Sequence, residues 1–168
     1  ARELAETPNV FRDNERVKYL HRNMGGDGHL SLEGEPEVDT QAERVRLGYG
    51  RFLDQRQEAI KGILGALSEP DNQPAIFHCA AGTDRTGVVS ALLLALAGVP
   101  DETIGHDYSL SADALFARYE VEGPPEDYAG ELTLKGVRER YAVADGMVLL
   151  MQYLRDGYGG AESYARHI

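Results

Sequence analysis

Apolar residues recur along the chain at spacings that predict several amphipathic helices. Between residues 42 and 67 the spacing is three and four positions, as on the buried face of one helix. That face comprises Phe52, Arg56, Ile60, Ile63, Leu64 and Leu67. Gly48 and Gly50 predict a break in this segment, because glycine disfavours helix interiors. Periodicity with Gly and Pro end signals predicts further helices, at residues 101–110 with Asp101 as the cap, at 112–119, within 133–155 and at 161–167.

Two short apolar runs, residues 16–20 and 74–77, predict strands. The polar, glycine-containing residues 24–40 predict a loop, whose second half forms either a lid or a plain surface connection. The second predicted strand leads towards an apolar run at residues 88–99, which predicts a helix. Ten residues join these two elements: His78, Cys79, Ala80, Ala81, Gly82, Thr83, Asp84, Arg85, Thr86 and Gly87. The centre of the chain is therefore predicted as strand, tight loop and helix.

This loop has the residues of an anion site with a nucleophile. At a helix N-terminus, free backbone N–H groups and the positive end of the helix dipole attract an anion, phosphate above all. The same field favours the thiolate of Cys79, which is the nucleophilic form. Arg85, six positions later, offers a planar guanidinium that matches two phosphate oxygens. The spacing therefore predicts that nucleophile, amides and cation meet at one phosphate group.

The ten residues resemble the signature of the cysteine-dependent protein tyrosine phosphatases: His-Cys, five residues, Arg and Thr. Their longer form is most similar to bacterial tyrosine/serine phosphatases, some of which accept phosphoinositides. The resemblance implies an α/β fold with a central, mainly parallel sheet flanked by helices. It also implies phosphate monoester hydrolysis through a cysteinyl-phosphate, on phosphotyrosine and in some members phosphoserine. The phosphate-binding residues would be Cys79, Ala80, Ala81, Gly82, Thr83, Asp84, Arg85 and Thr86.

A leaving phenoxide or alkoxide needs a proton, so the chemistry calls for an acid. Asp84 inside the loop and Asp27 in the glycine-rich segment are equal candidates, with Asp54 as the rival on a predicted helix. Asp84 has an alternative role as a structural anchor of the loop through backbone N–H groups. His78 is expected to hydrogen-bond to the backbone, the alternative being a general base. For Thr86 the resemblance implies a hydrogen bond to Cys79, the alternative being an ordinary first-turn hydroxyl.

The residue at position 83, Thr83, indicates how many phosphate groups the substrate carries. Family members that accept phosphoinositides carry Lys at this position, which adds charge for neighbouring phosphates. Thr83 therefore favours singly phosphorylated substrates, either a phosphorylated protein or a small phosphomonoester.

Composition narrows the partners. The net charge of −11 argues against nucleic acid and against stable association with anionic membranes. The single cysteine excludes an internal disulfide and suits a cytoplasmic setting, although secretion stays open if the natural start is missing. The five histidines show no metal-ligand spacing, so we expect neither metal nor cofactor.

The length of 168 residues predicts a single phosphatase domain over residues 1–168. The family's usual N-terminal segment and its strand are not recognisable, which predicts a chain lacking its N-terminal part. On that ground, the alternative function is a catalytically idle phosphate-binding module. A weaker alternative is sulfur transfer of the rhodanese type. Enzymes of that type have a similar loop, but without the Arg-Thr-Gly sequence that Arg85, Thr86 and Gly87 form here.

Overall fold

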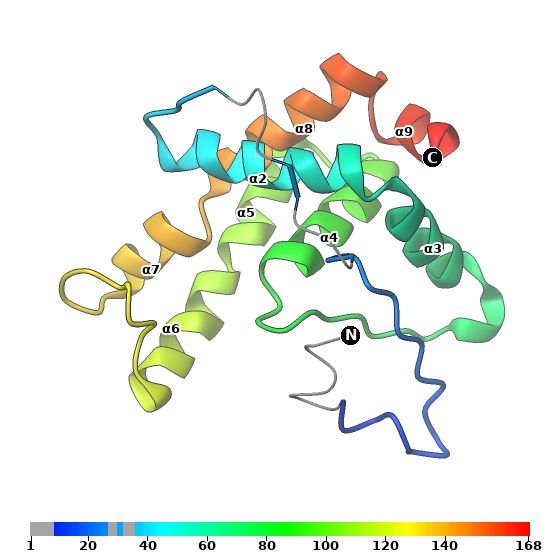
Figure 1. The fold of residues 1–168 in the computed structure, drawn as a ribbon, viewed down its shortest axis with the longest axis horizontal. Helices are drawn as coiled ribbons and strands as arrows, with labels where there is room; N and C mark the ends of the chain where they lie inside the picture. The colour runs from blue at the N-terminus through cyan, green and yellow to red at the C-terminus, as the bar shows by residue number, and fades with distance from the viewer. Residues whose placement is uncertain (1–8, 27–29, 32–35) are drawn as a thin grey trace.

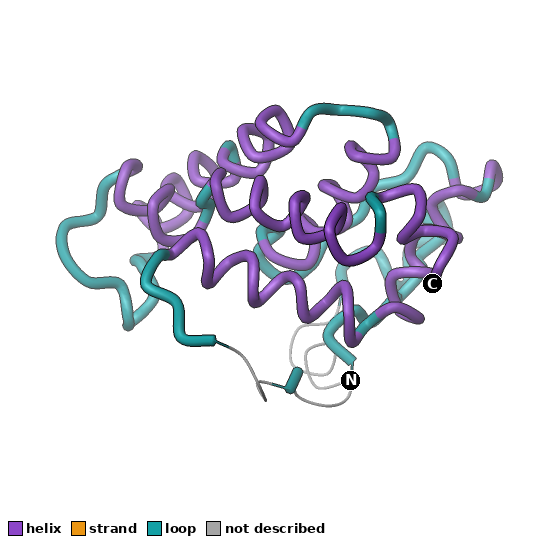
Figure 2. The backbone as a smooth tube through the Cα atoms, turned by 90° about the horizontal axis from the view of Figure 1, so that it is seen from above, coloured by secondary structure: helices purple, strands orange, loops and turns teal. Residues whose placement is uncertain are grey.

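The computed structural model describes residues 9–26, 30–31 and 36–168, and its regular structure is helical (Figures 1 and 2). The α-helices are α2 (Gln41–Gln55), α3 (Gln57–Ser68), α4 (Asp84–Leu96), α5 (Asp101–Ser109), α6 (Ser111–Glu122), α7 (Leu134–Tyr141), α8 (Ala144–Tyr158) and α9 (Ala161–His167). A short 3-10 turn, η1 (Pro70–Asn72), follows α3. Residues 27–29 and 32–35 of the predicted loop lie outside the described ranges.

The predicted central parallel sheet is wrong for this structure. No strand occurs in the ranges that the structure describes. Residues 75–79 have no regular secondary structure, and the side chain of Ile76 is 95% exposed. Residues 16–20 form a turn and irregular backbone, with Val17 and Leu20 exposed. An apolar run becomes a strand only by ladder hydrogen bonds to a neighbour, and the described residues supply no such neighbour to either run.

The long predicted helix at residues 42–67 breaks elsewhere than expected. Gly48 and Gly50 lie inside an uninterrupted α2, and the break falls at Arg56, between α2 and α3. Gly50 is buried where an added Cβ would lie 3.4 Å from the ring of Tyr153, so its small size serves packing. A capping box at Thr40 starts α2. Tertiary packing and the cap therefore outweigh the helix propensity of two glycines.

The other helix predictions hold with two corrections. Where one helix was expected within residues 133–155 there are two, α7 and α8, separated by Ala142 and Val143 in non-helical conformations. Asp101 lies in the first turn of α5 after the capping Pro100, where it forms an ion pair with Arg155 of α8. The helix predicted at residues 161–167 is α9. Of the predicted face at 52–67, Ile60 is fully buried and its apolar companions pack against the core.

Glycines bring the scaffold helices close together. An added Cβ on Gly146 of α8 would lie 2.6 Å from Val45 of α2, and one on Gly105 of α5 would lie 2.8 Å from the carbonyl oxygen of Ala144. α8 thus holds both α2 and α5, while α4 packs against α5 and α9 in the middle of the molecule (Figure 1). The N-terminus of α4, which follows the predicted phosphate loop, is therefore set on a rigid frame.

Candidate active site

The predicted phosphate loop is a tight bend that leads directly into α4. Gly82 adopts a φ of 80°, a left-handed conformation that favours glycine. Thr83 is buried, with 4% of its surface exposed, whereas Asp84 is exposed and begins the helix. Arg85 and Thr86 follow in the first helical turn, both half-buried. The loop and the first turn of α4 thus bring the predicted residues from Cys79 to Thr86 into one region.

Cys79 is half-buried and its environment favours the thiolate. Burial alone would raise the pKa of the thiol. The hydroxyl and N–H of Thr86, the N–H of Gly82 and the charge of Arg85 outweigh burial, so the pKa lies below its usual value. These donors are the ones that a loop before a helix N-terminus provides.

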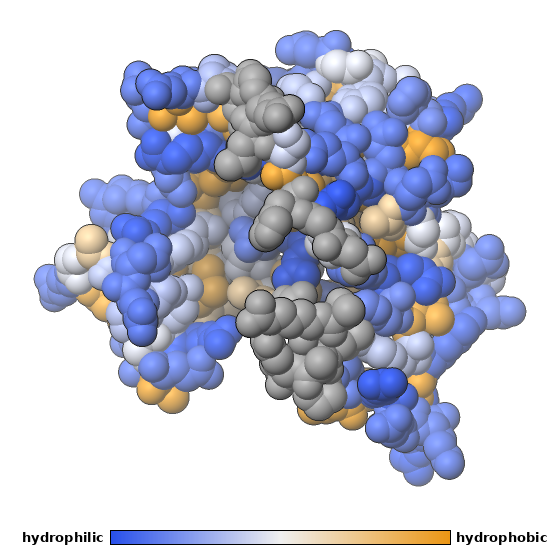
Figure 3. Space-filling model, in the orientation of Figure 1, coloured by the Kyte–Doolittle hydropathy of each residue, from blue (hydrophilic) through white to orange (hydrophobic). Residues whose placement is uncertain are grey.

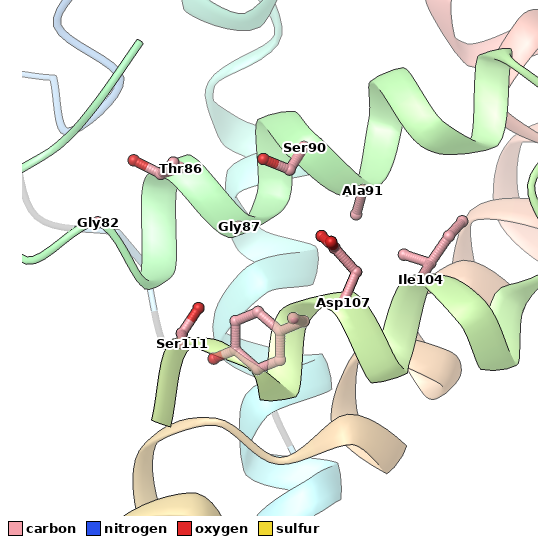
Figure 4. Close-up of a pocket in the computed structure, with 9 residues that line it drawn as sticks. Gly82, Thr86, Gly87, Ser90, Ala91, Ile104, Asp107 and Ser111 are labelled. Carbon is pink, nitrogen blue, oxygen red and sulfur yellow. The ribbon is translucent and has the colours of Figure 1, made fainter. Parts of the chain in front are cut away.

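The Thr86 hydroxyl is one of the groups that favour the thiolate of Cys79. Its Oγ1 is buried and has no other hydrogen-bond partner among the described residues. Thr86 also lines a small cleft of about 50 Å³ between α4 and α5. In Figure 4, Gly87 and Ala91 lie on the side of α4 that faces Asp107 and Ile104 of α5.

The His78 ring is held by two hydrogen bonds. Its Nδ1 lies 2.9 Å from the carbonyl oxygen of Cys79, and its Nε2 lies 2.9 Å from Nδ2 of Asn9. A carbonyl only accepts, so Nδ1 carries the proton and Nε2 accepts from the amide of Asn9. The ring is thus bonded to the backbone, as the sequence predicts, and both of its nitrogens have a hydrogen-bond partner.

Of the three candidate acids, the structure describes two. Asp84 accepts a hydrogen bond of 2.6 Å from the hydroxyl of Tyr49 on α2. Asp54 accepts from Tyr153 at 2.8 Å and from Tyr158 at 2.7 Å, both on α8. Asp54 therefore ties α2 to α8 and does not line the cavity in front of the loop. Asp27 lies outside the described residues.

A cavity of about 810 Å³ opens in front of Ala81, Thr83 and Asp84. Five of the chain's nine tyrosines line it, and these are Tyr49, Tyr108, Tyr119, Tyr128 and Tyr141. They come from α2, α5, α6, α7 and the segment before α7, so no motif in the sequence marks them. The richness in tyrosine, with no tryptophan, was the available signal.

Other features of the described residues add little chemistry. None of their histidine, cysteine, aspartate and glutamate side chains gather in a group of three or more that could hold a metal ion. None of the described helices is long and apolar enough to cross a bilayer. The visible face is mainly hydrophilic with scattered apolar patches (Figure 3).

Comparisons with known proteins agree with the family resemblance of the loop residues. Residues 1–168 match the model of a family described as the tyrosine phosphatase family. The chain is 29% identical to a tyrosine-protein phosphatase of Nostoc commune over 180 residues, covering 100% of this chain and 58% of that protein. It is 30% identical over 100 residues to the triple specificity protein phosphatase PtpB of Mycobacterium tuberculosis, covering 58% of this chain and 36% of that protein. The chain thus spans less than two thirds of either relative's length. No solved structure matches it.

Proposed function

Because the chain belongs to the tyrosine phosphatase family, we propose that it hydrolyses phosphate monoesters, phosphotyrosine in proteins above all, with phosphoserine as a second substrate. The observation that carries this proposal is the lowered pKa of Cys79 in a loop that ends at the N-terminus of α4. A thiolate, helix amides and Arg85 are the groups that attack and hold a phosphoryl group.

The reaction has two steps. The thiolate of Cys79 attacks phosphorus in line, the S–P bond forms, and the P–O bond to the leaving group breaks. Arg85 and the loop N–H groups bind the equatorial oxygens as their charge grows. Water then attacks phosphorus, the S–P bond breaks, and inorganic phosphate leaves. The Thr86 hydroxyl, which lowers the pKa of Cys79, would stabilise the departing thiolate.

Asp84 is the acid that we propose. It lies in the loop beside Arg85, lines the cavity and is exposed there, so its carboxyl group is accessible to a substrate. It would give a proton to the leaving oxygen in the first step and take one from water in the second. Asp27 remains the other candidate. We do not propose Asp54 as the acid, because two tyrosine hydroxyls of α8 already donate hydrogen bonds to its oxygens.

The cavity supports an aromatic, singly phosphorylated substrate. Its tyrosine rings suit packing against a phosphotyrosine ring in edge-to-face or offset geometry. Both of its arginines are engaged: Arg140 donates to Asp127, and Arg44 donates to Gln41. Glu131 and Glu139 add negative charge. With Thr83 in place of Lys, this lining offers little for the further phosphates of an inositide.

The cellular compartment follows from the chemistry of the Cys79 thiolate. A catalytic thiolate must stay reduced, so we propose a reducing, cytoplasmic compartment. The net charge of −11 makes nucleic acid and anionic membrane surfaces poor partners.

Hydrolysis of p-nitrophenyl phosphate by this chain tests the proposal, beside its Cys79→Ser variant and with orthovanadate as inhibitor. We expect turnover that vanadate inhibits and that the variant lacks. Circular dichroism of both proteins serves as the folding control. A folded wild-type protein that binds vanadate without turnover would support the idle phosphate-binding module instead. Thiosulfate turnover without phosphatase activity would support sulfur transfer.

A further inference from the structure

A row of hydroxyl groups runs from the core of the molecule to the phosphate loop. The Tyr49 hydroxyl lies 2.6 Å from Oδ1 of Asp84 and 2.7 Å from the hydroxyl of Tyr108. The Tyr108 hydroxyl in turn lies 3.1 Å from the carbonyl oxygen of Tyr141. The three side chains come from α2, α4 and α5, so the row links the loop's helix to two scaffold helices.

The direction of these hydrogen bonds follows from the number of protons. Each tyrosine hydroxyl has one proton and accepts through its lone pairs. Tyr49 donates its proton to the carboxylate of Asp84. The Tyr108 hydroxyl has one proton, which it donates to the carbonyl oxygen of Tyr141 at 3.1 Å or to the Tyr49 oxygen at 2.7 Å. Tyr49 is thus the donor that points at Asp84.

Burial keeps both hydroxyls protonated. It raises the pKa of Tyr49 far above its usual value, with the neighbouring Tyr108 and Asp84 adding to the effect. It raises the pKa of Tyr108 to about 12, which the hydrogen bond to Tyr49 partly offsets. Both groups therefore remain neutral donors over the whole range in which a phosphatase works.

Packing restricts the movement of the two tyrosines. Both are buried, and their rings meet edge to face with centroids 6.0 Å apart. The Tyr108 ring also lies against Gly87 of α4, where an added Cβ would be 2.9 Å from its carbons. A carboxylate on an exposed helix N-terminus has several rotamers, but a hydrogen bond from so fixed a donor selects one of them.

We propose that Tyr49 is a positioning residue for the general acid Asp84, with Tyr108 supporting Tyr49 from behind. This role rests on the proposed phosphatase function. Tyr49 holds Oδ1, so Oδ2 is the oxygen that faces the leaving group and carries the transferred proton. Once that proton has gone, the O–H donated by Tyr49 stabilises the carboxylate that remains.

The dependence of rate on the leaving group tests this role. p-Nitrophenolate leaves without a proton, whereas phenolate needs one, so loss of acid catalysis slows phenyl phosphate selectively. We expect Tyr49→Phe to lower kcat on phenyl phosphate by about ten- to a hundredfold, and to lower it far less on p-nitrophenyl phosphate. In an Asp84→Asn background, we expect Tyr49→Phe to have little further effect, because the two residues act as one unit.

Tyr153→Phe is the matched control. It also removes a tyrosine hydroxyl bound to an aspartate, at 2.8 Å from Asp54, but outside the cavity. We expect it to leave the ratio of the two rates unchanged. An equal loss on both esters, or an undiminished effect of Tyr49→Phe in the Asp84→Asn background, would overturn the positioning role alone. Absence of wild-type turnover would remove the proposed function and this role with it.

Discussion

Gly87 and the ring of Tyr108 are so close that a Cβ on the glycine would lie 2.9 Å from two ring carbons. The last glycine of the loop motif thus faces α5 and not the phosphate site (Figure 4). Its lack of a side chain lets the Tyr108 hydroxyl reach Tyr49, which in turn binds Asp84. The motif therefore contains a packing requirement as well as a chemical one.

We expect Gly87→Ala to lower the free energy of unfolding by about 1–3 kcal/mol, because the buried ring of Tyr108 must move. Urea unfolding measures this change. Gly65→Ala in α3 is the control, since no atom lies within 4 Å of its added Cβ. There alanine is expected to raise the free energy of unfolding by about 0.5–1 kcal/mol. Changes of the same sign in both variants would contradict the close contact.

The thiol of Cys79 provides a prediction about pH. Its pKa is lowered in the folded state, so the reactive thiolate persists to lower pH than in an ordinary cysteine and is lost as the pH falls through the folded value. Thr86→Val removes the hydroxyl that favours the thiolate, and we expect the midpoint of iodoacetamide alkylation to move to higher pH. Thr103→Val, on the exposed side of α5, should leave it unchanged. An unmoved midpoint in Thr86→Val would rule out the hydroxyl as a thiolate donor.

Asp54 is expected to matter for stability and not for turnover. Tyr153 and Tyr158 donate to its carboxylate, and burial together with Asp54 raises the pKa of Tyr158 to about 12. We expect Asp54→Asn to lower the free energy of unfolding by about 1 kcal/mol, given its exposure, and to leave kcat on phenyl phosphate unchanged. Asp84→Asn should lower that kcat by about a hundredfold. A comparable loss of kcat in Asp54→Asn would make Asp54 a candidate acid again.

The substrate proposal depends on position 83. Thr83 lines the cavity with a buried hydroxyl that has no hydrogen-bond partner among the described residues. A lysine there would extend into the cavity with its charge. We expect Thr83→Lys to raise turnover of polyphosphorylated inositides, while Thr83→Met, of similar length and uncharged, should not. If the lysine variant shows no gain, Thr83 does not determine the preference for singly phosphorylated substrates.

The candidate phosphate loop was predictable because its requirements are local. A nucleophile, a small-residue turn and an arginine within ten residues before an apolar helix are all visible in the sequence, and α4 begins at Asp84 as that pattern requires. Helices α5, α6 and α9 were predictable for the same reason, since their periodicity and end signals are local.

The sheet and the tyrosine row were not predictable from local patterns. Residues 74–77 satisfy the composition of a strand, but a strand also needs a partner, and Ile76 is exposed in the described structure. Tyr49 and Tyr108 lie 35 and 24 positions from Asp84 in the sequence, on opposite sides of it. Only the packing of α2, α5 and α8 brings their hydroxyls together, and no rule of sequence spacing predicts that contact.

Trapping the covalent intermediate tests the central claim most directly. The protein is mixed with excess p-nitrophenyl phosphate, quenched within the first turnover, digested and analysed by mass spectrometry, beside Cys79→Ser. Thr86→Ala is included because loss of its hydroxyl should slow the departure of sulfur and increase the trapped fraction. We predict phosphate on the peptide that contains Cys79, more of it in Thr86→Ala and none in Cys79→Ser. Turnover without phosphate on Cys79, or phosphate on another side chain, would contradict the cysteinyl-phosphate mechanism.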